Sequence, residues 1–320
     1  MAASSSSPSR WGLWKDTGLK LGEITLTETL DGGQTFRWRR EPDQTWIGQW
    51  SEYRVRLRLS NDSIMEYSVP HGSSRTIVPA LRTYLRTDTD FAALADTLPW
   101  RSDLHIAKCI AAFPGLRLPR QPFGETLLCF LCSATKQIVQ IKEMVALLAK
   151  NHGEEITGRA RPLTAQPSPR LRQARQRAVP TFHTLPTWET IATIPEDVLR
   201  QCQLGFRARY IAASAQYIVA RPGWLDETEQ LPYPEAKQRL MELPGVGAKV
   251  ADCVLLFGAG KLEAFPVDTW ILKAMARRYD LNGWKPDQIT HFGRQHFGPL
   301  AGLAQQYLFA YERAQARSKE

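Results

Sequence analysis

A short glycine-rich break between two helical patterns constrains this chain more than any other feature of its sequence. The segment Leu240–Phe257 reads LMELPGVGAKVADCVLLF. Pro244 ends the first helical pattern because proline lacks an amide hydrogen, and the glycines on either side of Val246 permit a tight turn. Ala248–Phe257 then starts a second helix, so the segment predicts two helices joined by a hairpin. The free amides at the start of the second helix favour an anion such as a phosphate.

Two charged residues beside this hairpin point to chemistry. Lys249 falls in the first turn of the second helix, where a positive charge is unfavourable, so the position favours a neutral amine that can act as a nucleophile. Asp268 lies in the segment Phe265–Trp270 (FPVDTW), at the start of another predicted helix. It could simply cap that helix. Alternatively, it places a fixed carboxylate beside the lysine, where it would stabilise a sugar cation as a glycosidic bond breaks.

The charge balance favours an anionic partner. Lysine and arginine number 41 against 32 acidic residues, a net charge of +9, and nucleic acid is the commonest large polyanion. No apolar run approaches the ~18 residues of a membrane span, and the serine-rich start has no signal-peptide pattern. The five cysteines and six histidines show no metal-ligand spacing, so neither a metal nor a cofactor is expected. We expect a bacterial cytoplasm or nucleoid, with a eukaryotic nucleus as the alternative.

The first hundred residues predict a small α+β unit. Hydrophobic residues alternate with arginines over Arg54–Leu59 and continue, after a turn, over Ile64–Val69, which is typical of an antiparallel sheet with one wet face. Ile24–Leu26 also alternates with threonines and predicts a further strand. Ile77–Leu85 has helical spacing. Three tryptophan rings are expected to be half-buried on the sheet: Trp38, Trp46 and Trp50.

After Pro122 the sequence predicts helices almost throughout. Phe123–Lys150 is expected to form one long helix, and further helices are expected near Phe206–Ala220, Thr269–Arg278 and Pro299–Ala316. We place a disordered tail at residues 1–10, the α+β domain at 11–115 and the all-α domain at 116–320. An insertion rich in arginine and proline, at 154–180, is either a solvated loop or a phosphate contact.

The hairpin and the aspartate together resemble the helix–hairpin–helix DNA glycosylase superfamily, and most closely its 8-oxoguanine DNA glycosylase/lyase branch. The resemblance rests on LPGVGAKVADCV followed by FPVD. It extends from about residue 11 to 316, apart from the insertion, through five further segments: Gly33–Trp38 (GQTFRW), Gly115–Gln121 (GLRLPRQ), Phe130–Ser133 (FLCS), Leu204–Tyr210 (LGFRARY) and Gln305–Phe309 (QQYLF). It implies a TATA-binding-protein-like antiparallel sheet, an all-α helix–hairpin–helix domain and a flipped base held between them.

By this resemblance the protein is a bifunctional enzyme that acts on double-stranded DNA containing 8-oxoguanine or abasic sites, as a monomer and without a cofactor. Lys249 would attack the sugar C1′ carbon, and Asp268 would support the oxocarbenium-like transition state. Gly33 would offer its carbonyl to the N7 hydrogen that distinguishes 8-oxoguanine from guanine. The resemblance places four further residues in the base pocket, with Cys253 and Phe309 sandwiching the base and Gln305 reading its Watson–Crick edge: Cys253, Phe257, Gln305 and Phe309.

The resemblance also implies residues that hold the DNA. Arg207 would contact the cytosine left behind, and Phe206 would wedge into the gap. The hairpin would hold a phosphate through the backbone of Gly245, Gly247 and Val250. A monovalent cation could bind there at three backbone carbonyls: Met241, Leu243 and Val246.

The sequence departs from the family where the opposite strand is read. Within the predicted long helix the family has an asparagine triplet and then an arginine, but this chain has Thr135, Lys136, Gln137 and, at the arginine position, Gln140. Trp270 stands where the family usually has a histidine that contacts phosphate. Two alternatives stay open: a non-catalytic DNA-binding module that uses the hairpin as a clamp, and an alkylpurine glycosylase that uses Asp268 alone. The presence of the lysine argues against both.

Overall fold

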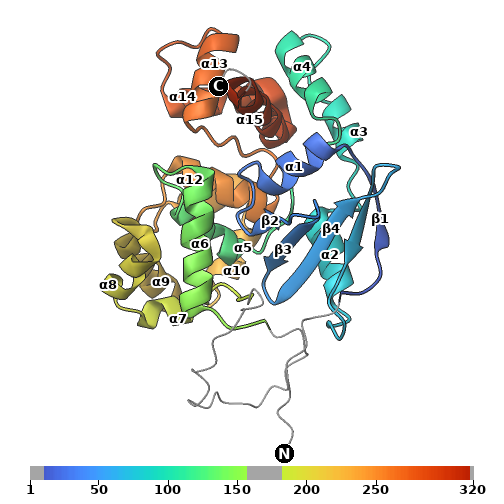
Figure 1. Cartoon of the computed structure of the whole chain (residues 1–320). Helices are drawn as coiled ribbons and strands as arrows, with labels where there is room; N and C mark the ends of the chain where they lie inside the picture. Colours follow the sequence, from blue (N-terminus) through green and yellow to red (C-terminus); the bar gives the residue numbers. More distant parts are fainter. Residues whose placement is uncertain (1–10, 157–181, 318–320) are drawn as a thin grey trace, which may run out of the picture.

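A five-stranded antiparallel sheet forms one side of the molecule and a set of helices forms the other (Figure 1). The computed structural model describes residues 11–156 and 182–317, so the predicted tail and most of the predicted insertion lie outside the described residues. The strand order is β1-β5-β4-β3-β2. The strands are β1 (Lys15–Lys20), β2 (Trp38–Arg40), β3 (Trp46–Trp50), β4 (Tyr53–Leu59) and β5 (Ile64–Ser68). The alternation read from the sequence therefore predicted β4 and β5 correctly.

One face of the sheet packs on α2 (Ile77–Leu85), the helix that the spacing predicted. The three tryptophans are fully buried there rather than half-buried, at 1%, 2% and 5% exposure, because α2 covers them: Trp38, Trp46 and Trp50. Trp38 donates a hydrogen bond of 2.9 Å to the Tyr84 hydroxyl, and the Trp50 ring lies 4.5 Å from the Tyr84 ring. The other face carries the predicted arginines but is only partly wet, because aromatic rings cover it. Arg58 lies over the Trp14 ring at 4.3 Å, whereas Arg54 lies over the Trp11 ring at 5.1 Å and is only 6% exposed.

The strand predicted at Ile24–Leu26 is wrong, because this segment belongs to helix α1 (Glu23–Asp31). Leu26 and Leu30 are buried four residues apart, on one helical face, whereas Ile24 is 67% exposed. The Thr29 hydroxyl also donates 2.8 Å to the Thr25 carbonyl, which satisfies it within the helix. Three alternating residues are too few to establish a period.

The remaining helices form the other side of the molecule and a layer above it, in which α13, α14 and α15 lie beside α4 (Figure 1). The short segments labelled η are π- or 3₁₀-helical turns. In chain order the helices are α3 (Phe91–Asp96), α4 (Leu104–Ala112), α5 (Phe123–Leu131), α6 (Ile138–His152), α7 (Trp188–Thr193), α8 (Glu196–Leu199), η1 (Arg200–Leu204), α9 (Arg207–Val219), α10 (Trp224–Gln230), α11 (Tyr233–Leu240), α12 (Ala248–Val254), η2 (Leu255–Ala259), α13 (Thr269–Arg278), α14 (Pro286–Phe297), η3 (Gly298–Leu300) and α15 (Ala301–Arg317). None of the helices among these residues is both long and apolar enough to cross a membrane.

The single long helix predicted at Phe123–Lys150 is also wrong, because α5 and α6 are separate helices. Thr135 has a φ of +55°, which a helix does not allow. Arg207 donates hydrogen bonds to the Ala134 carbonyl and, at 3.0 Å, to the Thr135 hydroxyl. Gln140 accepts the Gln137 amide at 3.2 Å and so starts α6. The turn between α5 and α6 is thus held by a distant arginine, not by a local glycine or proline.

One buried and one partly exposed ion pair fasten α1 to the helical side. Arg313 of α15 donates 2.8 Å to Glu28, and both side chains are nearly buried. Lys142 of α6 pairs with Asp31 at 2.6 Å. These contacts fix the loop that follows α1 against α6 and α15, and that loop contains Gly33.

Candidate active site

The predicted hairpin is present between α11 and α12. Gly245 has a φ of +82°, and a Cβ atom there would lie 2.7 Å from the Tyr210 side chain, so this position needs glycine. The Ser214 hydroxyl donates 3.1 Å to the Pro244 carbonyl. A Cβ at Gly247 would meet no atom within 4 Å, so the start of α12 faces open space. Val250, in the first turn of α12, is 8% exposed, so its side chain serves the core and only its backbone could serve a phosphate.

Lys249 points its amine at the end of α5. Its Nζ donates 3.2 Å to the Ser133 hydroxyl and lies 5.4 Å from the centre of the Phe130 ring. Phe130 in turn stacks on Phe257, with ring centres 5.6 Å apart and planes within 12°. Phe257 therefore contacts Phe130, and Phe130 in turn lies beside the Lys249 amine. The sequence reasoning assigned no role to Ser133 or Phe130, although both lie in the FLCS segment that carried the resemblance.

Asp268 caps α13 and also lies within electrostatic range of the lysine. Its Oδ1 accepts the amides of Trp270 and Ile271 at 3.0 and 2.9 Å. Burial raises the pKa of the carboxyl, while the Ile271 amide and the charges of Lys249 and Arg313 oppose that rise. The two interpretations of Asp268 are thus compatible, because the same carboxylate caps the helix and faces the amine.

Cys253 lies one helical turn after Lys249, on the same face of α12. It is 4% exposed, and burial raises the pKa of its thiol to about 12. The charge of Lys249 and a hydrogen bond with it only partly offset that effect. The thiol is therefore protonated at neutral pH and presents a small, neutral, polarisable surface beside the amine.

Gly33 is held with its carbonyl free. It has a φ of +93°, and a Cβ there would lie 2.9 Å from the Ile138 side chain and 3.7 Å from the Phe309 ring. Arg313 donates 2.6 Å to the Gly32 carbonyl, and the Gln121 side chain donates 2.8 Å to the Gln34 carbonyl. The carbonyls on both sides are thus fixed, whereas no residue within 11–156 or 182–317 donates to the Gly33 carbonyl itself.

α15 brings Gln305 and Phe309 toward Gly33. Gln305 is 3% exposed, and its side-chain oxygen accepts 2.7 Å from Gln306. This bond orients the amide and leaves its NH₂ group for another acceptor. Phe309 is half-buried, with the Arg313 guanidinium 5.3 Å from its ring centre. Arg313 therefore contacts both the Gly33 loop and Phe309, a role that no motif in the sequence indicates.

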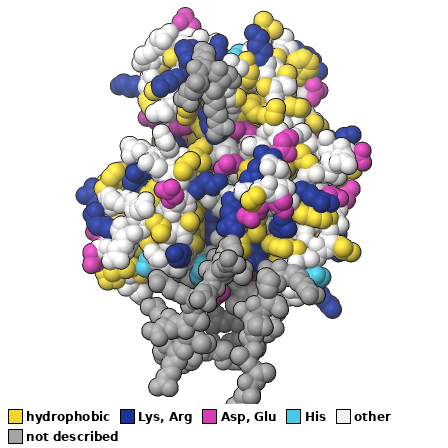
Figure 2. All heavy atoms as spheres, in the orientation of Figure 1, with side chains coloured by type: hydrophobic (Ala, Val, Ile, Leu, Met, Phe, Trp, Pro, Cys, Tyr) yellow, Lys and Arg dark blue, Asp and Glu magenta, His cyan; other side chains and the backbone are white. Residues whose placement is uncertain are grey.

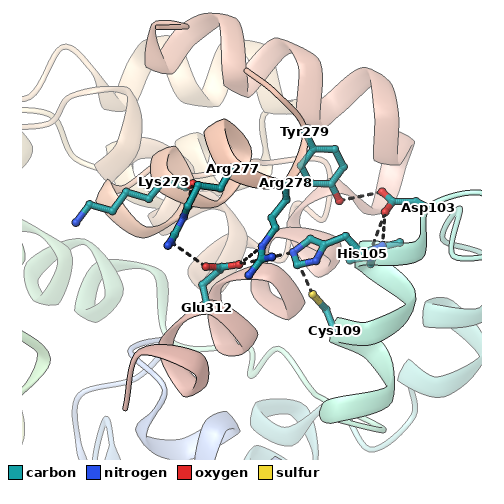
Figure 3. A network of polar contacts seen from close by, with 9 residues as sticks. Asp103, His105, Cys109, Lys273, Arg277, Arg278, Tyr279 and Glu312 are labelled. Carbon is teal, nitrogen blue, oxygen red and sulfur yellow. Dashed lines mark hydrogen bonds and ion pairs between the residues drawn. The ribbon is translucent and has the colours of Figure 1, made fainter. Parts of the chain in front are cut away.

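A polar network holds α13 and α15 in place (Figure 3). Glu312 of α15 is almost fully buried and accepts from Arg277 and Arg278 at the end of α13, both at 3.0 Å. Asp103, the cap of α4, accepts 2.8 Å from the Tyr279 hydroxyl. Burial lowers the pKa of His105, which lies between these groups, so it is neutral at pH 7. α13, which begins at Asp268, is thereby fixed at its far end to α15 and α4.

The residues predicted to read the opposite strand are mostly engaged within the protein. Arg207 is 3% exposed and donates to the Ala134 carbonyl, to the Leu204 carbonyl at 3.1 Å and to the Thr135 hydroxyl. Its guanidinium also lies 4.4 Å from the Phe206 ring centre. Phe206 is 44% exposed, which suits a wedge. Arg207, by contrast, supports the turn between α5 and α6.

The carbonyls predicted to hold a monovalent cation lie on the hairpin. The Leu243 carbonyl already accepts the Val246 amide at 3.1 Å, although a carbonyl oxygen has a second lone pair. Met241 is 45% exposed, so its end of the hairpin faces solvent. This cation site stays a prediction. Within the described ranges no three His, Cys, Asp or Glu side chains cluster as metal ligands.

Two family matches cover most of the chain. Residues 18–127 match the N-terminal domain of 8-oxoguanine DNA glycosylase, and residues 164–297 match the HhH-GPD superfamily of base excision DNA repair proteins. The N-terminal sheet domain and the helical domain that contains the hairpin are therefore those of the base-excision DNA glycosylase class.

Individual relatives show which branch of this class the chain resembles. The N-glycosylase/DNA lyase OGG1 of Arabidopsis thaliana is 30% identical over 316 residues, which cover 93% of this chain and 80% of that protein. A probable N-glycosylase/DNA lyase of Methanothermobacter thermautotrophicus is 30% identical over 226 residues, 69% of this chain and 70% of that one. A crystal structure of the Clostridium acetobutylicum 8-oxoguanine glycosylase/lyase, bound to double-stranded DNA with cytosine opposite 8-oxoguanine, has a TM-score of 0.78 at 28% identity and covers 91% of this chain and 92% of that one. The chain belongs to the 8-oxoguanine DNA glycosylase family.

Proposed function

We propose that this chain removes 8-oxoguanine from duplex DNA and then nicks the strand at the resulting abasic site. The observation that carries the proposal is the Lys249 amine, held between Ser133 and Phe130 within range of the Asp268 carboxylate. An amine can add to the sugar C1′ carbon as the base leaves, and the Schiff base that follows allows strand scission by β-elimination. A glycosylase that activates water would need only the aspartate.

Asp268 stabilises the positive charge that develops on the sugar. Its carboxylate is fixed by two backbone amides, so little reorganisation is needed when that charge appears. Partial burial strengthens the electrostatic effect, because the local dielectric constant is lower than that of water. The same two amides keep the carboxyl from turning away from the sugar.

The base pocket recognises 8-oxoguanine by its N7 hydrogen. The free Gly33 carbonyl accepts that hydrogen, whereas the N7 lone pair of guanine would be repelled by it. Unstacking a base costs a few kcal/mol, and contact with the Cys253 thiol and the Phe309 ring offsets part of that cost. The NH₂ group of Gln305, oriented by Gln306, reads the Watson–Crick edge of the flipped base.

The DNA backbone lies along the hairpin and the basic surface near it. Lys and Arg side chains gather near the middle of the face that Figure 2 shows. The open start of α12 at Gly247 offers amides to a phosphate, and the exposed Phe206 fills the gap left by the flipped base. All of these parts come from one chain, which supports action as a monomer.

The test is a panel of duplexes that contain 8-oxoguanine, hypoxanthine, uracil, 3-methyladenine or an abasic site. We expect excision of 8-oxoguanine, nicking at the abasic site, and a covalent adduct when borohydride is present. Binding without excision or adduct would favour the non-catalytic clamp. Excision of 3-methyladenine without an adduct would favour an alkylpurine glycosylase.

A further inference from the structure

A second basic site lies away from the hairpin, where the two sides of the molecule meet. An open cavity of about 530 Å³ lies between the end of α2 and the residue that follows η2. Its lining carries three arginines and one carboxylate, and therefore an excess of positive charge: Arg82, Arg86, Arg120 and Asp88. The arginines come from both sides, because Arg82 and Arg86 belong to α2 and its cap, whereas Arg120 precedes α5.

Two of these arginines have no ionic partner within residues 11–156 and 182–317. The Arg82 guanidinium makes no hydrogen bond or ion pair there, and that of Arg86 only lies over the Phe91 ring at 5.1 Å. Arg120, by contrast, pairs with Glu229 at 2.5 Å. Arg82 is exposed and Arg86 is half-buried. Burial and the charge of Arg120 lower the pKa of Arg86, and the carboxylate of Asp88 only partly opposes this. An anion between the arginines would reduce their mutual repulsion.

The loop that presents Arg86 is fixed in advance. Arg86 has a φ of +51°, which is rare for a residue other than glycine. The buried Arg117 holds that conformation by donating to three carbonyls: those of Leu85 at 3.1 Å, Arg86, and Thr89 at 3.0 Å. Burial lowers the pKa of Arg117 only to about 10, so this buried guanidinium stays charged at neutral pH and adds to the positive potential beside the loop.

On the opposite wall, the Arg120 guanidinium lies close to Gly260. A Cβ there would be 2.6 Å from an Arg120 Nη atom, and the φ of +68° also favours glycine at this position. Gly260 directly follows η2, whereas Lys249 lies at the start of α12. These eleven intervening steps correspond to roughly 16 Å of helix, so the cavity is distinct from the proposed active site.

We propose that this cavity binds a phosphate-bearing compound of nucleotide size, with Arg82 and Arg86 holding the phosphate. Guanidinium groups bind phosphate oxygens in pairs of hydrogen bonds. The Thr87 hydroxyl, which has no partner among the described residues, adds a further donor. The volume lies in the usual ~300–1,000 Å³ range for small-molecule sites and leaves room for more than a phosphate alone. Such a ligand would join the sheet side to the helical side.

The experiment is calorimetric titration of the full chain with inorganic phosphate, pyrophosphate and adenosine monophosphate, alone and with saturating undamaged duplex. Arg82→Gln and Arg86→Gln are the test variants, and thermal melting checks that each folds. Arg101→Gln is the matched control, since this 65% exposed arginine carries the same charge outside the cavity. We expect a single binding site for pyrophosphate or adenosine monophosphate, and we expect the same binding when the duplex is already bound. We expect it to weaken at least about tenfold in each test variant, as for loss of one charge-assisted contact, and to stay unchanged in the control.

Each other outcome has a defined meaning. If the two variants weaken duplex binding but no small phosphate binds, the phosphate comes from the DNA backbone and the small-molecule assignment is wrong. If all variants bind every probe as the wild type does, or if the control loses as much as the test variants, the cavity is not a phosphate site. Borohydride trapping on damaged duplex should be unaffected by Arg82→Gln, which separates this site from the function proposed above.

Discussion

The damaged-base side and the opposite-strand side of the site differ in how their polar groups are used. On the damaged-base side, here Lys249, Asp268, Gly33 and Phe309, the key groups are fixed by neighbours yet keep a free face, such as the Gly33 carbonyl. On the opposite-strand side, which is the turn between α5 and α6 together with Arg207, the Arg207 guanidinium already donates to groups inside the protein. A residue such as Arg207 can therefore match a family motif in sequence although its hydrogen-bond donors already bind groups inside the protein.

The sharpest way to test this contrast is Lys249→Gln, which keeps the side-chain length and removes the amine. Because Lys249 supplies the amine whose charge acts on Asp268, we expect loss of both base excision and borohydride trapping, with binding of damaged duplex retained. Gel-shift and trapping assays on one preparation measure this. A variant that still forms the adduct would place the nucleophile elsewhere.

Asp268→Asn should give the next largest effect. Asparagine keeps much of the capping contact but loses the charge, so excision should fall by at least the ~10²-fold typical of losing one transition-state stabiliser. Single-turnover excision measures the loss, and the melting temperature should change little. A large drop in melting temperature with unchanged activity per folded molecule would instead show that Asp268 only caps α13.

The raised pKa of Asp268 predicts a pH effect of intermediate size. Burial favours the protonated form, so excision should decline on acidification at a higher pH than an ordinary aspartate, near 3.9, would give. Because the pKa of this carboxyl is higher in the folded than in the unfolded protein, the wild type loses stability as the pH rises from the unfolded to the folded pKa. Asp268→Asn cannot ionise, so its stability relative to wild type should increase across that window. Excision and denaturant midpoints measured against pH check both signs. If the excision rate of Asp268→Asn falls at the same low pH as that of the wild type, another group causes the decline.

The smallest effect is expected on the opposite-strand side. Each good bidentate contact to a base is worth about 1–3 kcal/mol. Arg207 and Thr135 hydrogen-bond to each other within the protein. The Gln140 side-chain oxygen accepts the Gln137 amide, and its uncharged NH₂ group makes a weaker contact to cytosine than an arginine would. We therefore expect 8-oxoguanine to be excised at comparable rates opposite cytosine, thymine, guanine or adenine. Single-turnover rates on the four duplexes test this. A preference of a hundredfold or more for cytosine over adenine would mean that Arg207 exchanges its internal bonds for the base.

Local sequence patterns predicted those parts of the fold that depend on local contacts. The alternation over Arg54–Leu59 and the helical spacing of Ile77–Leu85 were correct, because each segment buries one hydrophobic face. The turn between α5 and α6 was not predicted, because the Arg207 side chain that holds it lies 72 residues from Thr135 in the sequence. A single sequence does not contain that pairing.

The same division applies to the site. The hairpin motif identified Lys249 and Asp268, because glycine and proline force the turn wherever it occurs. The supporting groups were not predicted, since Arg313 reaches Gly32 across 281 residues and Lys249 meets Ser133 across 116. Motifs thus predict where the reactive groups lie, whereas long-range contacts decide which of them stay free.

The ion pair between Glu28 and Arg313 can form only late in synthesis of the chain, after α15 has been made. The two residues are 285 positions apart, so the ribosome adds almost the whole protein before Glu28 meets its partner. At about 5–20 residues per second, this takes roughly 15–60 s. Until then the Gly33 loop lacks the donor that fixes it, and the pocket for the base is incomplete. A nascent or truncated chain that ends before α15 would therefore carry its nucleophile without the pocket that selects the lesion.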